Sequence, residues 1–285
     1  MISPFVRTIL IFGGINAVQA LGLYLPFSGG QLSFAQGGFM AIGAYSSAVL
    51  TRNFGIPFGF ALIAGALFSS AVGLAVCFPA LRVKGIYLLL ITMGFNEVIR
   101  VFFLNFKYTG GVGGFTNILP LTNLFNLYLV LILLIIFFYR FQYSRLGRAL
   151  RAIDQDQEAA EARGVPLTRI RIFAFGVGAF IAGLAGGFYA HFVMFIESET
   201  FGFYRSLEAM MFVILGGSQV FWGSVVGAYL LTVIPESFRF LQKFRFEFFG
   251  VCLIIMMILR PMGLLDQEVC RWRWWKERLW GGGTK

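Results

Sequence analysis

Long apolar runs separated by short polar stretches dominate the chain. About 20 apolar residues carry a helix across a bilayer, so most of these runs are long enough to span one. Two of them, 36–50 and 206–217, are too short to cross squarely, which indicates tilted, broken or re-entrant segments. The pattern predicts an all-α, polytopic transmembrane helical bundle of about nine spans, with one or two short, broken or re-entrant segments. The runs fall at 5–26, 36–50, 57–79, 85–106, 121–141, 171–195, 206–217, 220–235 and 246–260.

Composition supports a membrane protein rather than a soluble domain. Of the 285 residues, 58% are hydrophobic and only 13% are charged, and the mean hydropathy is +0.80. A soluble domain is about a quarter charged, because its surface must face water. The N-terminal run lacks the charged region and the cleavage site of a signal peptide, so we expect it to be a retained span. Three widely spaced cysteines give no disulfide framework and no metal-binding spacing: Cys77, Cys252 and Cys270.

The net charge of +10 comes from basic residues that cluster in a few loops between the apolar runs. This distribution is typical of membrane topology and differs from the basic face of a nucleic-acid-binding domain. Because Lys and Arg are enriched in cytoplasmic loops, we predict a transmembrane domain over 1–265 whose loop at 142–170 is cytoplasmic. A basic, Trp-rich tail at 266–285 follows on the same side, and the N-terminus is outside. Three basic residues then fall outside, against the rule: Arg239, Lys243 and Arg245.

No motif for catalysis, cofactor binding or metal binding is present. His191 is the single histidine, so a His-based metal cluster is not available, and no G-x-x-x-x-G-K-S/T phosphate loop occurs. A membrane enzyme is therefore the weakest class of function. Without a nucleotide site of its own, active transport by this chain needs an ion gradient or an ATPase partner. For His191, which lies at the outer end of a span, two roles stay open: interfacial structure, or gating of a solute.

A polar segment, DQDQEAAEARGVP at 154–166, lies between two apolar runs and reads as a short helix. Asp154 is a candidate N-cap, acidic residues occupy the first turn, and Gly164 followed by Pro166 ends the helix. We expect Gly164 to adopt the left-handed conformation there. A helix this polar cannot lie in lipid. It is either a solvated connector or an element that fills a groove on another protein.

This segment resembles the EAA motif of ABC importer permeases. Glu158-Ala159-Ala160, followed after three residues by Gly164, is similar to the centre of that motif, whereas the I-x-L-P that follows it in the family is absent. In that family the loop forms a coupling helix that docks into a cleft of the ATPase. The resemblance therefore implies an ATPase-coupling role for Asp154, Glu158, Ala159, Ala160 and Gly164.

Three further stretches resemble the permeases of branched-chain amino-acid ABC importers, and they occur in the family's order. They are GQLSFAQGGFMAIGAY at 30–45, YLLLITMGFNEVIR at 87–100 with TGGVGGF at 109–115, and LGGSQVFWGSVVGAY at 215–229. Together they are most similar to the M-type, LivM-like subunit. Compared with that type the N-terminus is short, so we expect no counterpart of that type's first helix in this sequence.

The resemblance implies a multi-pass permease subunit of an ATP-driven importer in the bacterial inner membrane. It implies branched-chain, hydrophobic amino acids as solutes, with a urea or short-amide ABC permease as the alternative within the family. The expected partners are a second homologous permease, two cytoplasmic ATPases and a periplasmic solute-binding protein, besides membrane lipid. No cofactor is expected in this chain, since the ATPases would bind ATP and Mg²⁺. An ion-coupled secondary transporter is the alternative from another class, and Glu97 and Glu208 are its candidate cation ligands.

Polar and ionisable side chains inside the apolar runs are the candidates for the translocation path, because such groups are unfavourable in lipid without a function or a partner. Glu208 lies in the short segment 206–217, and broken helices commonly build solute sites. Glu97 and Arg100 are three residues apart on one helical face, so they can also form a structural ion pair. The candidate path residues are Gln31, Ser33, Gln36, Thr92, Asn96, Glu97 and Glu208.

Overall fold

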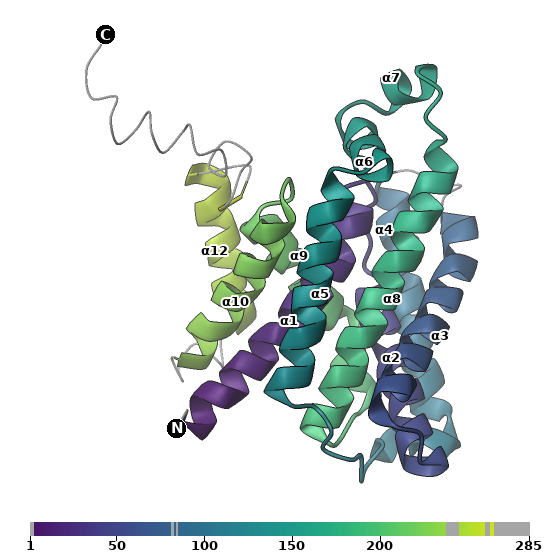
Figure 1. Cartoon of the computed structure of the whole chain (residues 1–285), viewed down its shortest axis with the longest axis vertical. Helices are drawn as coiled ribbons and strands as arrows, with labels where there is room; N and C mark the ends of the chain where they lie inside the picture. The colour runs from purple at the N-terminus through teal and green to yellow at the C-terminus, as the bar shows by residue number, and fades with distance from the viewer. Residues whose placement is uncertain (1–2, 81–82, 84, 238–244, 260–262, 265–285) are drawn as a thin grey trace.

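The structure is a computed structural model, and it describes residues 3–80, 83, 85–237, 245–259 and 263–264. Within these residues all regular secondary structure is helical, and one isolated β-bridge joins Phe115 to Ile196. The tail at 266–285, including Cys270, and the basic residues Arg239 and Lys243 lie outside the described residues. The α-helices are α1 Pro4–Phe27, α2 Gln36–Phe54, α3 Phe58–Ala80, α4 Ile86–Asn105, α5 Leu124–Gln142, α6 Arg145–Gln155, α7 Gln157–Ala162, α8 Leu167–Val193, α9 Phe203–Gly216, α10 Phe221–Ser237 and α12 Arg245–Leu259 (Figure 1).

The helices begin and end where local chemistry favours it. Ser3 caps α1 by accepting a hydrogen bond from the amide of Val6, and Pro4 occupies the first turn, where its missing N–H is not needed. At the other end of the next helix, Gly55 adopts the left-handed conformation with φ of 63°, and Pro57 follows. Apolar runs bounded by such signals therefore become helices of nearly the predicted extent.

Five helices, α1, α3, α4, α5 and α8, are long and apolar enough to cross a membrane. The pair Ser198–Gly216 and Phe221–Ser237 is bent by 118° and counts as a sixth candidate span if taken as one element. The predicted all-α bundle and the predicted break near 206–217 are thus confirmed. The count of about nine spans is not confirmed, because α2, α9, α10 and α12 do not each qualify as a span alone.

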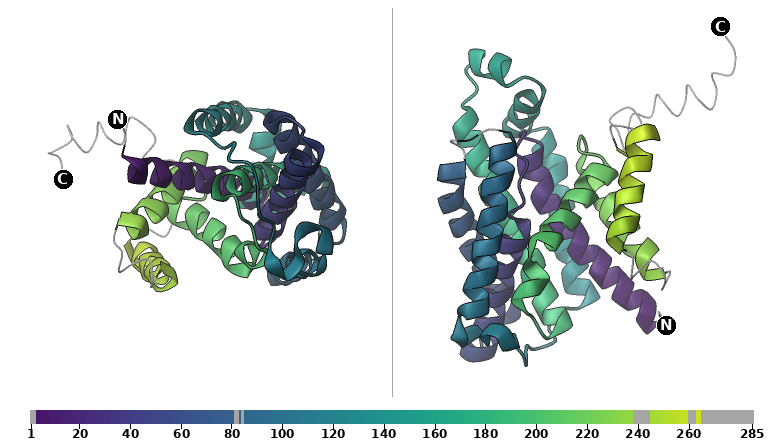
Figure 2. Two further views of the ribbon diagram at one scale, coloured as in Figure 1. Left: turned by 90° about the horizontal axis from the view of Figure 1, so that it is seen from below. Right: turned by 180° about the vertical axis from the view of Figure 1, so that it is seen from behind.

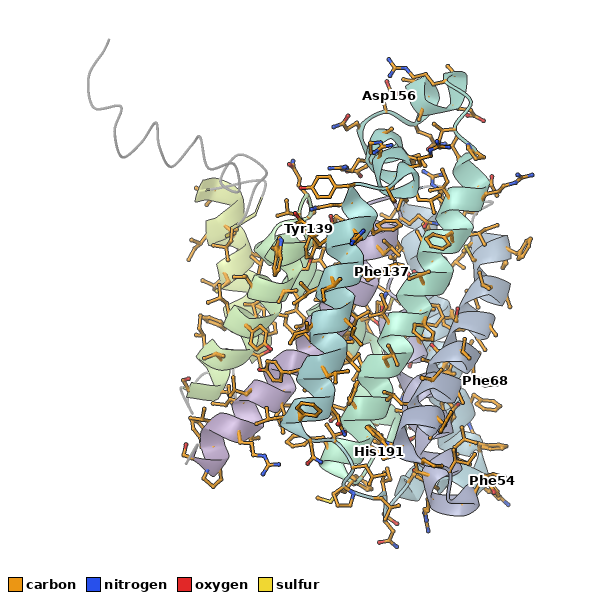
Figure 3. All side chains as sticks on the ribbon, viewed as in Figure 1. Phe54, Phe68, Phe137, Tyr139, Asp156 and His191 are labelled. Atoms are coloured by element: carbon orange, nitrogen blue, oxygen red, sulfur yellow. The ribbon has the colours of Figure 1, made fainter. Side chains whose placement is uncertain are left out.

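The bundle is built around α8, which is buried along most of its length, with α1, α2 and α3 packed against it. Glycine lets α2 and α8 approach closely: a Cβ atom at Gly186 would lie 1.9 Å from the carbonyl oxygen of Met40. In contrast, α3 and α5 turn apolar side chains such as Phe68 and Phe137 outward (Figure 3). These outer faces suit lipid.

Two helices begin in the interior of the bundle rather than at its surface. The chain leaves α1 at the α7 end, returns inward through 28–35, and starts α2, which ends at Phe54 at the opposite end (Figures 1 and 3). Similarly, α8 ends opposite α7, the chain returns through 194–202, and α9 begins against the start of α2 (Figure 2). The amide of Gly37 donates to Oγ of Ser206 over 2.8 Å, which joins the two starting turns. Broken helices that enter from opposite ends are an arrangement found at transporter solute sites.

Candidate functional site: a coupling loop and a polar junction

The coupling loop consists of α6, α7 and the residues that join them to α5 and α8, and it projects from one end of the bundle (Figure 1). Ser144 caps α6, since its Oγ accepts from the amide of Gly147 over 3.1 Å. On the inner face of α6, Leu150 and Ile153 are buried. This helix therefore lies flat on the bundle as a platform for α7.

The predicted N-cap of the polar helix is wrong. The cap of α7 is Asp156, whose Oδ1 accepts from the amide of Ala159 over 3.0 Å, whereas Asp154 lies in the last turn of α6 (Figure 3 labels Asp156). Burial of Ile153 keeps α6 helical to Gln155, so Asp156 is the first non-helical residue available for capping. Partial burial raises the pKa of the Asp154 carboxyl above its ordinary value.

The EAA residues divide between the surface and the bundle. Glu158 and Ala159 are exposed on the projecting helix, while Ala160 is buried beneath it. Gly164 is left-handed with φ of 78°, as predicted, and its amide donates to the carbonyl of Glu161. The amide of Val165 donates back to the carbonyl of Ala160, which completes a Schellman-type helix end.

The coupling loop is tied to the transmembrane helices through Arg171 at the start of α8. Nη2 of Arg171 donates to Oε1 of Gln157 in α7 over 3.1 Å, and Nε donates to the carbonyl of Gly29 beyond α1. An apolar groove of about 460 Å³ also lies in this part of the molecule, and both α6 and α8 line it. Its walls include Leu146, Pro166 and Phe173. Sequence reasoning missed the contacts of Arg171, because no motif links these three elements.

The polar junction is the region where α2 and α9 begin against the middle of α4. Three of the seven candidate path residues, Gln36, Thr92 and Asn96, are buried there, and two more, Gln31 and Ser33, are buried in the return segment 28–35 that leads to it. Oγ1 of Thr92 accepts from the amide of Phe34 over 3.0 Å, which attaches the return segment to α4. Ser206, which sequence reasoning did not single out, is also fully buried and contacts Gly37. A serine within the short run 206–217 was the available signal.

Several amide groups of the junction and of the return segment have no hydrogen-bond partner among the described residues. These are both side-chain polar atoms of Gln31, both of Asn96, and Oε1 of Gln36. A buried donor or acceptor left without a partner destabilises a protein by about 1–3 kcal/mol, so such groups are rare unless they have another role. The junction therefore offers hydrogen-bonding capacity that the fold itself does not use.

Glu208, a sixth candidate, is separate from these amides and pairs with Arg205 on the same helix. Nη1 of Arg205 lies 2.9 Å from Oε2 of Glu208, and Nη2 donates to Oδ1 of Asn16 over 2.8 Å. Asn16 in turn donates to Thr232 over 2.8 Å, so this network holds α9 to α1 and α10. Beside it lies a cavity of about 200 Å³ lined by Tyr189, Thr200, Tyr204, Arg205 and Glu208.

The seventh candidate, Glu97, forms the predicted pair with Arg100, with 2.5 Å between Oε1 and Nη2. Glu199, in the 3₁₀ turn η3 Ser198–Phe201, also pairs with Arg100, which sequence reasoning missed because 99 residues separate them. These groups are not enclosed by the chain, since the side chains of Glu97 and Glu199 are 47% and 66% exposed. Whether the pair serves structure or the solute path stays a prediction.

His191 is fully buried at the end of α8 opposite α7 (Figure 3). Its Nε2 lies 2.9 Å from Oγ1 of Thr51, and its Nδ1 lies 2.8 Å from the carbonyl oxygen of Gly187. Because both ring nitrogens have local partners, the geometry favours the structural role over gating. In the described part of the chain, no three His, Cys, Asp or Glu side chains gather into a group that could hold a metal ion.

Comparison with known proteins identifies the family. A family model described as branched-chain amino acid transport system / permease component matches residues 5–260, which include the coupling loop and the junction. The chain belongs to this family. Together with its apolar helices, this membership shows a multi-pass membrane permease, and it confirms the resemblance on which the sequence interpretation rested.

The relatives include two permease proteins of branched-chain amino acid transport systems, LivM and LivH. The chain is 33% identical to the high-affinity branched-chain amino acid transport system permease protein LivM of Salmonella typhimurium, over 93% of this chain and 69% of that protein. LivM of Escherichia coli is 32% identical over the same shares. The LivH permease protein of Salmonella typhimurium is 28% identical over 44% of this chain and 41% of that protein. No solved structure matches the chain significantly.

Proposed function

We propose that this chain is a permease subunit of an ATP-driven importer of branched-chain amino acids in the bacterial inner membrane. It forms the translocation path with a second homologous permease. Two cytoplasmic ATPases bind ATP and Mg²⁺ and drive the transport, and a periplasmic solute-binding protein delivers the solute. The observation that carries the proposal is α7, a polar helix held outside the bundle in a chain of the branched-chain permease family.

The geometry of the coupling loop supports the energy-coupling role. α7 presents Glu158 and Ala159 outward, and Ala160 anchors the helix to the bundle. A displacement of α7 reaches α8 through the contact of Gln157 with Arg171, and α8 is the helix on which α1, α2 and α3 pack. Movement of an ATPase against this loop would therefore be transmitted to the centre of the bundle. The whole loop at 142–170 is cytoplasmic in this proposal.

The unpaired amides of the junction support its role in the path. An amino acid needs hydrogen bonds at its polar end and apolar contacts along its side chain, and Asn96 lies beside the ring of Phe95, which packs against Phe39. A site of neutral amides binds weakly, which allows release. The same amides favour a urea or short-amide solute as the second candidate. An ion-coupled mechanism is less well supported, because Glu97 and Glu208 are each paired with an arginine.

The coupling role can be tested by crosslinking in the assembled complex. Since Ala160 is buried, Ala159→Cys is the better probe, in a background without the native cysteines. We expect it to crosslink to an ATPase subunit, whereas Leu119→Cys, exposed at the opposite end, should not. Uptake of leucine and of urea into proteoliposomes that contain ATP then identifies the solute. Leucine uptake without any crosslink, abolished by an ionophore, would instead establish the ion-coupled alternative.

A further inference from the structure

A cavity of about 480 Å³ lies at the α7 end of the bundle, and α1, α5, α6 and the first turn of α10 contribute to its lining. Farther from α7, α5 and α10 lie side by side, since the hydroxyl of Tyr229 donates to that of Tyr128 over 3.0 Å (Figure 1). At the cavity itself, the stacked rings of Phe138 and Phe221 form part of the wall, with their centroids 6.0 Å apart. The volume falls within the range of about 300–1,000 Å³ that is typical of sites for small molecules.

Two arginines of α6 place positive charge beside this cavity. Nη2 of Arg151, which lines it, donates to the carbonyl of Gln142 over 2.6 Å, and Nη1 of Arg148 donates to the carbonyl of Tyr143 over 2.6 Å. Each of these bonds uses one of the five N–H donors of a guanidinium group. Among the residues that the structure describes, neither arginine forms an ion pair, and α6 carries three arginines but a single acidic residue. The α6 side of the cavity is therefore suited to an anion.

The exposed rim of the cavity is aromatic, and it continues into two apolar stripes. Tyr139, Tyr143 and Trp222 line the cavity, and each is at least 40% exposed (Figure 3 labels Tyr139). Such rings are typical of the level at which the headgroups of a bilayer meet its hydrocarbon. At spacings of three or four residues from these rings, exposed apolar side chains follow on the same helical faces: Ile132 and Ile136 of α5, and Val226, Leu230 and Val233 of α10. The cavity thus opens onto surfaces that suit acyl chains.

We propose that this cavity binds the phosphate headgroup of an anionic phospholipid, whose phosphate pairs with Arg148 and Arg151 and whose acyl chains lie on the α5 and α10 stripes. The inference goes beyond the import function and does not depend on the solute or on the partner subunits. A free phosphate would pair with the arginines but would leave the apolar stripes without a ligand. The basic tail at 266–285 has the same sign of charge as the arginines, so it is a poorer occupant. A lipid held here would connect α6, the platform of α7, to α10.

Fluorescence quenching by brominated lipid tests the site in the assembled complex. Bimane is attached to Ile136→Cys on the α5 stripe and to Leu67→Cys on α3 as the control position, because these side chains are 53% and 58% exposed. The complexes lack other cysteines and are placed in phosphatidylcholine nanodiscs that contain a minor share of brominated phosphatidylglycerol or of brominated phosphatidylcholine. We expect brominated phosphatidylglycerol to quench position 136 more strongly than brominated phosphatidylcholine does, and the two lipids to quench position 67 equally.

Substitutions of the arginines separate a lipid site from a purely structural role at the end of α5. Arg151→Gln should lower the preference for phosphatidylglycerol at position 136 about fivefold, which corresponds to the loss of one basic residue at an anionic surface. Arg151→Lys keeps the charge and should retain most of the preference. If Arg151→Gln does not assemble, Arg148→Gln provides the same test, because Arg148 is exposed. Arg140→Gln is the matched control and should leave the preference unchanged, since Arg140 is exposed on α5 and is not part of the lining.

Four results would overturn the proposal. Equal quenching of position 136 by the two lipids would show that the site does not select an anionic headgroup. A preference that falls as much in Arg140→Gln as in Arg151→Gln would reflect the general surface charge. Loss of the preference on addition of inorganic phosphate would indicate a site for a soluble anion, and absence of quenching by either lipid would show that protein covers the α5 stripe. None of these results bears on ATP-driven leucine uptake, which tests the import function separately.

Discussion

The coupling loop and the polar junction differ in how far their polar groups are hydrogen-bonded within the chain. In the loop, Asp156 caps the start of α7, and the amide of Val165 donates to a carbonyl at its end. Residues close in sequence therefore pair the terminal backbone groups of this helix. In the junction, the side-chain amide of Asn96 is buried with no partner among the described residues. A satisfied and exposed element can be pushed as a rigid body, whereas unsatisfied buried groups are available to a solute. The difference fits the two proposed roles, in which the loop transmits force from the ATPase and the junction contacts the solute.

Replacing a glycine by valine should have different effects in the two regions, and the largest effect is expected at Gly37 in the junction. A Cβ atom there would lie 2.5 Å from the carbonyl oxygen of Phe201 and 2.9 Å from Oδ1 of Asn96. We expect Gly37→Val to force α2 and α9 apart and to abolish assembly of folded protein. Size-exclusion chromatography in detergent measures this loss. As a control, Gly59→Val introduces a Cβ with no neighbour within 4 Å and should assemble normally.

In the coupling loop, replacing a glycine by valine should reduce transport and leave assembly of the folded protein unchanged. Gly164→Val places a β-branched residue at φ of 78°, but no atom lies within 4 Å of its Cβ. We expect a folded, inserted chain whose ATP-driven uptake is abolished, because the end of α7 is distorted. Gly164→Asn should restore much of the uptake, since asparagine tolerates the left-handed region. Normal uptake by the valine variant would remove the basis for the coupling role.

Asn96→Leu tests whether the unpaired amide of the junction contacts the solute. The amide of Asn96 has no partner in the part of the chain that the structure describes, so an apolar side chain of similar volume should leave thermal stability unchanged or raise it. Uptake should fall strongly if the amide contacts the solute. The measurements are thermal unfolding of the purified complex and the initial rate of uptake. A marked loss of stability would show that Asn96 has a structural partner.

The ion pairs of α4 should show a smaller, graded effect. Arg100 holds both Glu97 and Glu199, and an unpaired charge in a membrane span costs at least about 2.5–3.5 kcal/mol on insertion scales. Arg100→Gln should therefore reduce assembled protein more than Glu97→Gln, which leaves one pair intact. The double change Glu97→Gln with Arg100→Gln should recover part of the loss. If it assembles normally yet does not transport, Glu97 serves the solute path instead.

The smallest effect is expected at the cap of α7. Asp156→Ala removes the acceptor for the amide of Ala159 and should destabilise the helix by about 1 kcal/mol. The change is local, so hydrogen exchange at α7 should accelerate while the transmembrane helices stay protected. Asp154→Ala is the matched control, because Asp154 lies within α6 and caps nothing. Faster exchange in the control alone would reverse the assignment of the cap.

The sequence alone determined the features that depend on neighbours along the chain. The run at 57–79 became α3 Phe58–Ala80, and the run at 85–106 became α4 Ile86–Asn105, because helix formation and partition into lipid are local properties. Gly164 was correctly expected to be left-handed, since the helix before it has to end there. The family was also identified from short motifs, which the match over residues 5–260 confirms.

Only the tertiary structure decided which of these elements meet. It placed the cap at Asp156 rather than Asp154, because burial of Ile153 against the bundle extends α6. It joined Gly37 to Ser206, 169 residues apart, and it brought Glu199 to Arg100. In a sequence that is apolar nearly throughout, every helix can pack against many others, so hydrophobic pattern does not select the neighbours. Two factors select the neighbouring helices: glycines allow close approach, and buried polar groups need partners. Both factors depend on the whole bundle.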